Sequence, residues 1–284
     1  MDMPGVLYVV ATPIGNLEDM TRRGADVLRS VAMIAAEDTR RTRVLLDAIG
    51  AVGAQLLALH THNESAAVGR VVARLKEGAD VALVSDAGTP LLSDPGFELV
   101  RACWQAGIAV VPVPGASAIM AILSVCPLPV GRFTFEGFLP ARAGARRERL
   151  QALVTAADAA VFFEAPHRMA ECLADLAALV PDRRIMIGRE MTKLHEQYLW
   201  GRPAELLAQL QDAGQLRGEF AVVLSGAGDG AVAPDVRRTM TVLARELPPA
   251  QAARLGAELL GVGKRELYAL ALELRPSAPE EDSA

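Results

Sequence analysis

The stretch VSDAGTPLLSDPG, at Val84–Gly96, combines residue types and spacing that could do chemistry. It follows an apolar run and contains two aspartates, two prolines and two glycines in thirteen residues. A simple strand-to-helix turn needs only one glycine and a capping residue. Open α/β sheets bind ligands at the carboxyl ends of their strands. Glycine lets a backbone pass close to a ligand, and Asp86 can accept hydrogen bonds. Asp94, in Asp-Pro-Gly, is more simply explained as the cap of the next helix.

Five further polar clusters accompany this turn, most of them directly after apolar runs, and each alone is typical of a capped turn. They are Thr12–Asn16, Ala36–Arg40, Pro114–Ala118, Glu164–Arg168 and Arg189–Lys193. Gathered along one edge of a sheet, they would line a cleft. The chain has neither the P-loop nor the dinucleotide fingerprint expected in a phosphate-binding site. A cleft of backbone amides, carboxylates and small residues therefore favours a zwitterionic ligand over a polyphosphate.

Other common catalytic and metal-binding patterns are missing. There is no G-x-S-x-G or H-E-x-x-H motif, which argues against covalent hydrolase and zinc-protease chemistry. The three cysteines are scattered, so the sequence predicts neither a disulfide framework nor a zinc ribbon. The pair His60 and His62 has too few accompanying ligands, and we expect no metal site.

Charge is unevenly distributed in this chain of net charge −5. Arg40–Arg43 and the segment Arg142–Arg149, expected to be a loop, are locally basic. Such clusters are either solvated helix faces or grips for a phosphate backbone. No apolar stretch is long enough to span a membrane, and the first residues do not resemble a signal peptide, so we expect a cytoplasmic protein.

The spacing of apolar runs predicts two α/β domains followed by a small helical segment. Strands alternating with helices over residues 1–125 indicate a largely parallel sheet. After the Pro-containing hinge Cys126–Pro129, a second α/β domain is expected over 126–230. Residues 235–274 have a helical pattern around Gly261–Gly263, which suits a helix-turn-helix or a helical hairpin. The acidic stretch 275–284 is expected to be a disordered tail. Predicted strands are Val6–Val10, Ala32–Ala36, Gln55–Leu59, Val81–Val84, Ile108–Val113, Phe133–Phe138, Ala159–Phe163, Arg184–Arg189 and Phe220–Leu224.

Seven ordered motifs resemble those of the ribosomal RNA small subunit methyltransferase I family, the 16S rRNA (cytidine-2′-O)-methyltransferases, which share their fold with the tetrapyrrole methylases. The motifs, which span about Val6 to Leu224, are VVATPIGNLEDMTRRG, AAEDTRRTRVLL, VSDAGTPLLSDPG, VPVPGASA, FEGFLPAR, FFEAPHR and REMTKLHEQ. The resemblance implies S-adenosylmethionine in a cleft between two α/β domains, a homodimer, and 16S rRNA of the small ribosomal subunit as partner. The wider fold has Gly-Asp-Pro where this chain has Ser85-Asp86-Ala87.

The resemblance also assigns roles to residues. Around the cofactor it implies Pro13, Asp86, Gly88, Thr89, Ser117, Ala118 and Phe163.

Methylation of a ribose 2′-hydroxyl calls for positioning and for a proton acceptor. The candidates are Asp38, Glu37 and Glu190, with His195 as an outsider, and we favour Asp38 and Glu190 as catalytic. For RNA we expect Arg40, Arg142, Arg146, Arg147 and Arg168, although Arg40 and Arg168 could instead hold the carboxylates.

Two other functions stay open at this stage. One is a methyltransferase of a tetrapyrrole or another small molecule on the same fold, which would not need the basic clusters or the terminal helices. The other is a non-catalytic RNA-binding protein.

Overall fold

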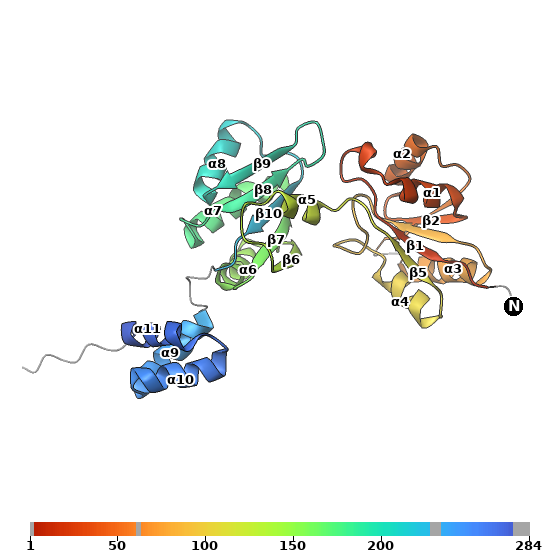
Figure 1. Cartoon of the computed structure of the whole chain (residues 1–284). Coiled ribbons are helices and arrows are strands. Elements are labelled where there is room, and N and C mark those ends of the chain that lie inside the picture. The colour runs from red at the N-terminus through yellow and green to blue at the C-terminus, as the bar shows by residue number, and fades with distance from the viewer. Residues whose placement is uncertain (1–2, 61–63, 228–233, 275–284) are drawn as a thin grey trace, which may run out of the picture.

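The computed structural model describes residues 3–60, 64–227 and 234–274, and consists of two α/β domains and a C-terminal helical bundle (Figure 1). His62, residues 228–233 and the expected tail 275–284 lie outside the described residues. In the part of the chain that the structure describes, no helix combines the length and apolar character needed to cross a membrane.

The first domain is built on a parallel sheet with strand order β3-β2-β4-β1-β5. Its strands are β1 (Leu7–Val10), β2 (Met33–Ala36), β3 (Gln55–Ala58), β4 (Val81–Val84) and β5 (Val110–Val113). All four residues of β2 and of β4 are buried, because helices cover both faces of a parallel sheet. Leu7 of β1 lies opposite Val81 on one side and Val110 on the other, so β1 and β4 are neighbours at the centre of the sheet.

Helices begin where the sequence supplies caps. Helix α1 (Arg22–Ser30) starts after Thr21 and α2 (Thr39–Ile49) after Asp38, and both caps accept a hydrogen bond from a first-turn amide. These helices pack on one face of the sheet, whereas α3 (Glu64–Lys76) and α4 (Phe97–Gln105) pack on the other. A short 3₁₀ helix, η1 (Leu17–Asp19), follows β1.

The second domain has a mixed sheet with strand order β6-β7-β10-β8-β9. Its strands are β6 (Phe133–Phe138), β7 (Ala159–Glu164), β8 (Ile185–Arg189), β9 (Gln197–Gly201) and β10 (Phe220–Leu224). Only β6 and β7 run parallel; the other neighbours are antiparallel. Helices α6 (Ala143–Thr155), α7 (Pro166–Leu179) and α8 (Pro203–Asp212) enclose the core on one face. The structure thus adds an edge strand, β9, that the sequence did not predict.

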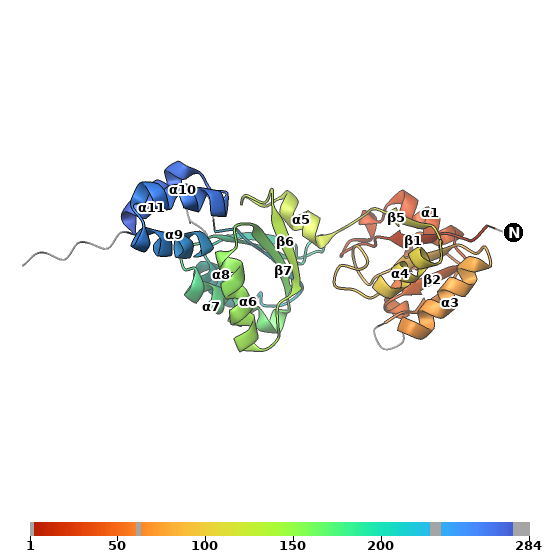
Figure 2. The ribbon, with the colours of Figure 1, turned by 90° about the horizontal axis from the view of Figure 1, so that it is seen from below.

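The boundary between the domains lies earlier than residue 125. Helix α5 (Ala118–Ser124) packs its Ile119, Ile122 and Leu123 against Val161 and Val223 of the second sheet. The chain therefore passes from one domain to the other at about Pro114–Ser117, as Figure 2 shows, and not at the prolines that follow α5. An amphipathic helix belongs to the domain that buries its apolar face, whatever prolines follow it.

The C-terminal bundle has three helices instead of the two expected. They are α9 (Pro234–Glu246), α10 (Pro249–Leu260) and α11 (Lys264–Glu273). Pro248 and Pro249 separate the first two, because proline cannot continue a helix from its interior, and Gly261 ends α10 in a left-handed conformation. Met240, Ala253 and Leu267 meet in a separate core, and both views place the bundle beyond the second domain (Figures 1 and 2).

Candidate active site

The turn after β4 is tied directly to the loop after β1. Thr12 and Gly88 exchange two backbone hydrogen bonds of 2.9 Å, and the Thr12 hydroxyl donates to the Ser85 carbonyl at 3.2 Å. Gly88 has a φ of +81°, a conformation that a side chain would strain. Because β1 and β4 are adjacent in a parallel sheet, their carboxyl ends bring these two loops together at one edge of the first domain.

A cavity of about 430 Å³ opens at this edge and is lined by both domains. That volume lies within the usual range for small-molecule sites. The first domain contributes Glu37, Asp86, Asp94 and the Gly88 turn, whereas the second contributes Phe138, Phe163 and Glu219. Of the seven residues expected around a cofactor, Asp86, Gly88, Thr89, Ser117, Ala118 and Phe163 line the cavity. Pro13 is not among the lining residues, although its neighbour Ile14 is.

Aromatic rings form the second-domain wall of the cavity. The centroid of Phe163 lies 5.2 Å from that of Phe135 and 5.6 Å from that of Phe138, in edge-on and tilted arrangements. Phe138 is exposed although it is large and apolar. Such a surface suits a flat ring in the ligand.

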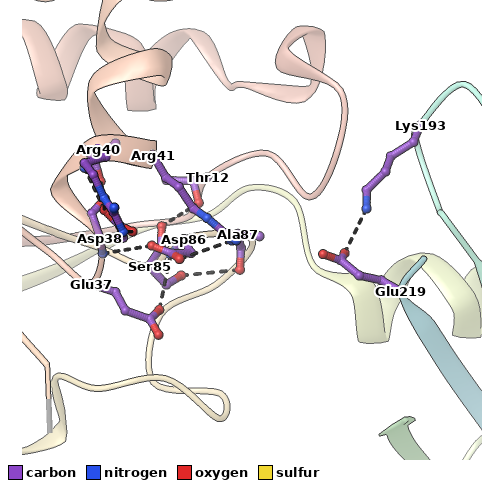
Figure 3. Close-up of polar contacts among 11 residues, drawn as sticks. Thr12, Glu37, Asp38, Arg40, Arg41, Ser85, Asp86, Ala87, Lys193 and Glu219 are labelled. Carbon is purple, nitrogen blue, oxygen red and sulfur yellow. Dashed lines mark hydrogen bonds and ion pairs between the residues drawn. The ribbon is translucent and has the colours of Figure 1, made fainter. Parts of the chain in front are cut away.

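The carboxylate of Asp86 organises the first-domain wall. It accepts a hydrogen bond from the backbone N–H of Asp38 at 2.9 Å and forms an ion pair with Arg41 at 3.2 Å. The backbone N–H of Asp86 in turn points to a Glu37 carboxylate oxygen at 3.5 Å. Figure 3 shows this group facing Lys193 and Glu219 across the space between the domains. Asp86 thereby joins the end of β2 to the turn after β4.

Asp38, expected to act as a proton acceptor, caps α2 and is held by Arg40. Its two carboxylate oxygens accept hydrogen bonds from the Arg40 side chain at 3.1 and 2.7 Å, and one of them also accepts from the Arg40 backbone N–H. The Arg40 guanidinium holds the pKa of Asp38 well below its usual range. The side chain that lines the cavity from this segment is that of Glu37, the preceding residue.

Glu190, the second expected catalytic residue, stands just outside the cavity. It has a φ of +48° and accepts hydrogen bonds from Lys193 Nζ at 2.8 Å and from the Glu219 backbone N–H at 2.9 Å. Burial raises its pKa, but the contacts with Lys193 and the Glu219 amide outweigh burial, so the pKa is lowered. The catalytic roles of Asp38 and Glu190 stay predictions. His195 is exposed, and its carbonyl accepts a bond from Arg189.

The loop that contains Glu190 also joins the two domains. The backbone N–H of Asn16 donates to the Thr192 hydroxyl at 3.1 Å. A Cβ atom on Gly15 would lie 2.4 Å from Lys193 Cγ, so only glycine fits this approach. The cavity is therefore closed on this side by a contact between the loop after β1 and the loop after β8.

The arginines expected to bind RNA fall into two groups. Arg40, Arg142 and Arg147 are exposed, although Arg40 pairs with Asp38 and Arg147 with Asp175. Arg146 is 1% exposed and bonds Asp175 and Glu171 at 2.9 Å, and therefore it cannot grip RNA in this structure. The segment 143–149 is helical rather than a loop, and its turn points Arg146 inward.

Arg168 is also a structural residue. Its side chain is 15% exposed and pairs at 2.6 Å with Glu164, whose side chain is fully buried. The prediction that Arg168 contacts RNA is not supported by this position, whereas the alternative that it holds a carboxylate agrees with it.

Asp94 differs from its expected role. Helix α4 begins at Phe97 with Gly96 as its N-cap, and no side chain caps it. The Asp94 side chain instead lines the cavity, where burial raises its pKa against a hydrogen bond from Ser85. Phe138, Met191 and Glu219, which also line the cavity, were not predicted as site residues. Their motifs FEGF, REMT and the strand at Phe220 were visible in the sequence, but a single sequence does not say which side chains face a cleft.

Comparison with known proteins agrees with this architecture. Residues 6–207 match the family of Tetrapyrrole (Corrin/Porphyrin) Methylases, and residues 230–275 match the RsmI C-terminal HTH domain. A protein of Xylella fastidiosa named Ribosomal RNA small subunit methyltransferase I is 51% identical over 94% of this chain and 99% of its own length. One of the same name from Pseudomonas aeruginosa is 47% identical over 95% of this chain and 97% of its own.

The chain belongs to the ribosomal RNA small subunit methyltransferase I family, within the tetrapyrrole methylases. Among solved structures, a cobalt precorrin-4 methyltransferase superposes with a TM-score of 0.59 at 16% identity, over 77% of this chain and 94% of that one. A diphthine synthase gives 0.56 at 14% identity, over 78% and 89%. At these identities the structures show the fold alone. The family is one of methyltransferases, and the cavity between the domains is the candidate active site.

Proposed function

We propose that this protein transfers a methyl group from S-adenosylmethionine to the 2′-hydroxyl of a cytidine in 16S rRNA of the small ribosomal subunit. The observation that carries the proposal is the interdomain cavity built by the family's own motifs, in a chain that matches rRNA methyltransferases over almost its full length. A cytoplasmic location and a homodimer belong to the same proposal, the first because the substrate is the ribosome and the second because the family resemblance implies it.

The residues of the cavity fit such a cofactor. S-adenosylmethionine would supply an electrophilic methyl group carried on a positively charged sulfur. Three first-domain acidic residues, Glu37, Asp86 and Asp94, line the cavity, and Arg41 pairs with Asp86. Phe138 and Phe163 offer a surface for a flat ring, and the Gly88 turn lets the backbone approach closely. The chemistry of this wall suits a cation better than a polyphosphate.

RNA would reach the cavity over the exposed arginines. Arg40 and Arg43 lie in the first turns of α2, and Arg41, at the same helix end, lines the cavity itself. Arg142 at the start of α6, together with the exposed Arg147, offers a second basic group on the other domain. Phosphate contacts of this kind position an RNA strand without reading its sequence. A small-molecule substrate would not need them.

The test is a transfer assay with tritiated S-adenosylmethionine on 30S subunits, free 16S RNA and a tetrapyrrole precursor. Label on one cytidine ribose of the subunit or the RNA, mapped by nuclease digestion, is the expected result. Gly88→Val would place a side chain on a residue with a φ of +81°, and its Cβ would lie 3.2 Å from the Ile14 side chain. This variant should abolish transfer. The control is Glu98→Gln, an exposed position on α4. Label on the tetrapyrrole alone would contradict the RNA substrate. RNA binding without transfer to any acceptor would favour a binding protein.

A further inference from the structure

Five carboxylates line the cavity, and their contacts differ. They are Glu37, Asp86, Asp94, Glu164 and Glu219. Glu164 is paired with Arg168 and Glu219 with Lys193. The Asp86 carboxylate accepts a hydrogen bond from the Asp38 amide and pairs with Arg41.

Glu37 and Asp94 are the two of these carboxylates that form no ion pair in the described part of the chain. Within the same described residues, the Glu37 carboxylate accepts one hydrogen bond, the 3.5 Å contact with the Asp86 amide, which is at the limit of hydrogen bonding. Glu37 lies at the carboxyl end of β2, the strand next to β4, and lines the cavity from the first domain. A ligand group entering the cavity would therefore find in Glu37 a carboxylate with free acceptor positions.

The surroundings of Glu37 also favour protonation. Burial raises the pKa of Glu37, and the nearby carboxylates of Asp86 and Asp94 raise it further, against smaller opposite effects of the hydrogen bond from the Asp86 amide and of Arg41. On the second-domain side, Glu164 and Glu219 line the same cavity, each with its own cation. A carboxylate whose pKa moves toward neutrality is a stronger proton acceptor than an ordinary one.

The two carboxylates favoured from the sequence have the opposite environment. Asp38 is held by the Arg40 guanidinium and Glu190 by Lys193, and the pKa of each is lowered. Neither lines the cavity. A proton acceptor must reach the hydroxyl that it deprotonates and must be basic enough to keep the proton, and Glu37 meets both conditions better.

We propose that Glu37 is the catalytic residue that accepts the proton of the 2′-hydroxyl during methyl transfer. The inference rests on the proposed function. In the step, the ribose oxygen uses an electron pair to form the new bond to the methyl carbon, and the bond from that carbon to sulfur breaks with its pair left on sulfur. The hydroxyl proton passes to a carboxylate oxygen of Glu37, which water then deprotonates. Asp86 and Asp94 act on Glu37 as neighbouring negative charges.

The deciding variant is Glu37→Gln, which keeps the size of the side chain but cannot accept a proton. It should lower the single-turnover transfer rate by about 10²–10⁴-fold, the usual contribution of general acid–base catalysis. Binding of S-adenosylhomocysteine, measured by calorimetry on the free enzyme, should change by less than about threefold, because the uncharged amide keeps a hydrogen-bonding group in place. Glu77→Gln, an exposed glutamate directly after α3, is the matched control and should leave both quantities unchanged.

The pH dependence provides a second readout. The wild-type rate should rise as pH increases through the raised pKa of Glu37, and this acid limb should be missing in the residual activity of Glu37→Gln. In the free enzyme, a carboxyl whose folded pKa is raised contributes stability below its unfolded pKa and loses it as pH rises through the folded pKa. Glu37→Gln should therefore raise the melting temperature at pH 7 relative to the wild type by more than at pH 4.

Four results would overturn the assignment. Normal transfer by Glu37→Gln would remove the acceptor role, as would loss of S-adenosylhomocysteine binding with an unchanged rate at saturation, which would make Glu37 a cofactor ligand. Loss of transfer in Asp38→Asn or Glu190→Gln, with retention in Glu37→Gln, would move the role to the residue affected. If the wild type itself transfers nothing to RNA, the proposed function fails and the acceptor role fails with it. If the wild type and Glu37→Gln transfer equally well, only the acceptor role is overturned.

Discussion

Two arginine-rich stretches look alike in the sequence and differ in the structure. Arg40, Arg41 and Arg43 lie at the start of α2, all three exposed. In α6, Arg146 is buried between α6 and α7 and holds Asp175 and Glu171, whereas Arg147 beside it is exposed. Arg146 is buried because it lies on the face of α6 that packs against α7, and α7 provides carboxylates on that face. The arginines at the start of α2 face solvent and the cavity instead. An arginine cluster therefore indicates a binding surface only after the acidic residues around it are known.

The largest expected effect is the loss of Arg146. Arg146→Ala removes the buried one of the two arginines that pair with the buried Asp175 and should reduce the free energy of unfolding by about 3–5 kcal/mol. Urea denaturation of the full chain measures this. Because the charge pair itself has a high desolvation cost, the double variant Arg146→Met with Asp175→Leu should recover most of the loss. An unchanged midpoint for Arg146→Ala would show that the buried pair is not important for stability.

RNA affinity tests the same comparison at the surface. Replacing Arg40 and Arg43 together by alanine should weaken RNA binding and make the slope of log K against log salt shallower by about 1.4, since each phosphate contact contributes about 0.7. Arg142 and Arg147, changed together, form the matched pair on α6 and should have a similar effect. The measurement is a filter-binding or anisotropy titration across salt concentrations.

The outcome for Arg146 decides between the two explanations of that stretch. Arg146→Met in the background of Asp175→Leu should leave the salt slope as in the wild type. A slope reduced by that double variant as much as by the surface pairs would mean that Arg146 reaches the RNA after all and that the structure changes on binding.

The smallest effect concerns stability at Arg147. This side chain is 66% exposed and shares Asp175 with Arg146. Arg147→Ala should reduce the free energy of unfolding by less than about 1 kcal/mol, because exposed ion pairs contribute little. A loss as large as that of Arg146→Ala would contradict the view that burial, and not the ion pair itself, separates these two neighbouring residues.

Acid sensitivity follows from the same carboxylate. Burial would raise the pKa of Asp175, but the hydrogen bonds from Arg147 and Arg146 outweigh burial and lower it. A carboxyl with a lowered folded pKa contributes stability above its unfolded pKa, and that stability is lost as pH falls through the folded pKa. The double variant Arg146→Met with Asp175→Leu should therefore lose less stability than the wild type between about pH 5 and pH 3. Equal losses would show that Asp175 is not linked to acid unfolding.

Much of the fold could be predicted from the sequence, because apolar runs and their spacing are local properties. All nine predicted strands are present within one or two residues, and Thr21, Asp38 and Ser117 cap helices as their types favour. Strand β9 was not predicted because QYLWG is only half-buried at the edge of its sheet and has no long apolar run. The sequence prediction placed helix α5 in the first domain because the prolines that follow it indicated a domain boundary. The sequence does not show which sheet buries the apolar face of this helix.

The sequence by itself determined which first-domain motifs meet at the candidate active site, since in a parallel sheet the ends of neighbouring strands must share an edge. Only the tertiary structure decided which side chain of each motif faces the cavity. Asp38 and Glu37 are adjacent and chemically alike, yet Asp38 caps α2 and binds Arg40, whereas Glu37 lines the cavity beside Asp86 and Asp94. That choice depends on strand register, helix phase and charges from distant segments, which no local pattern contains.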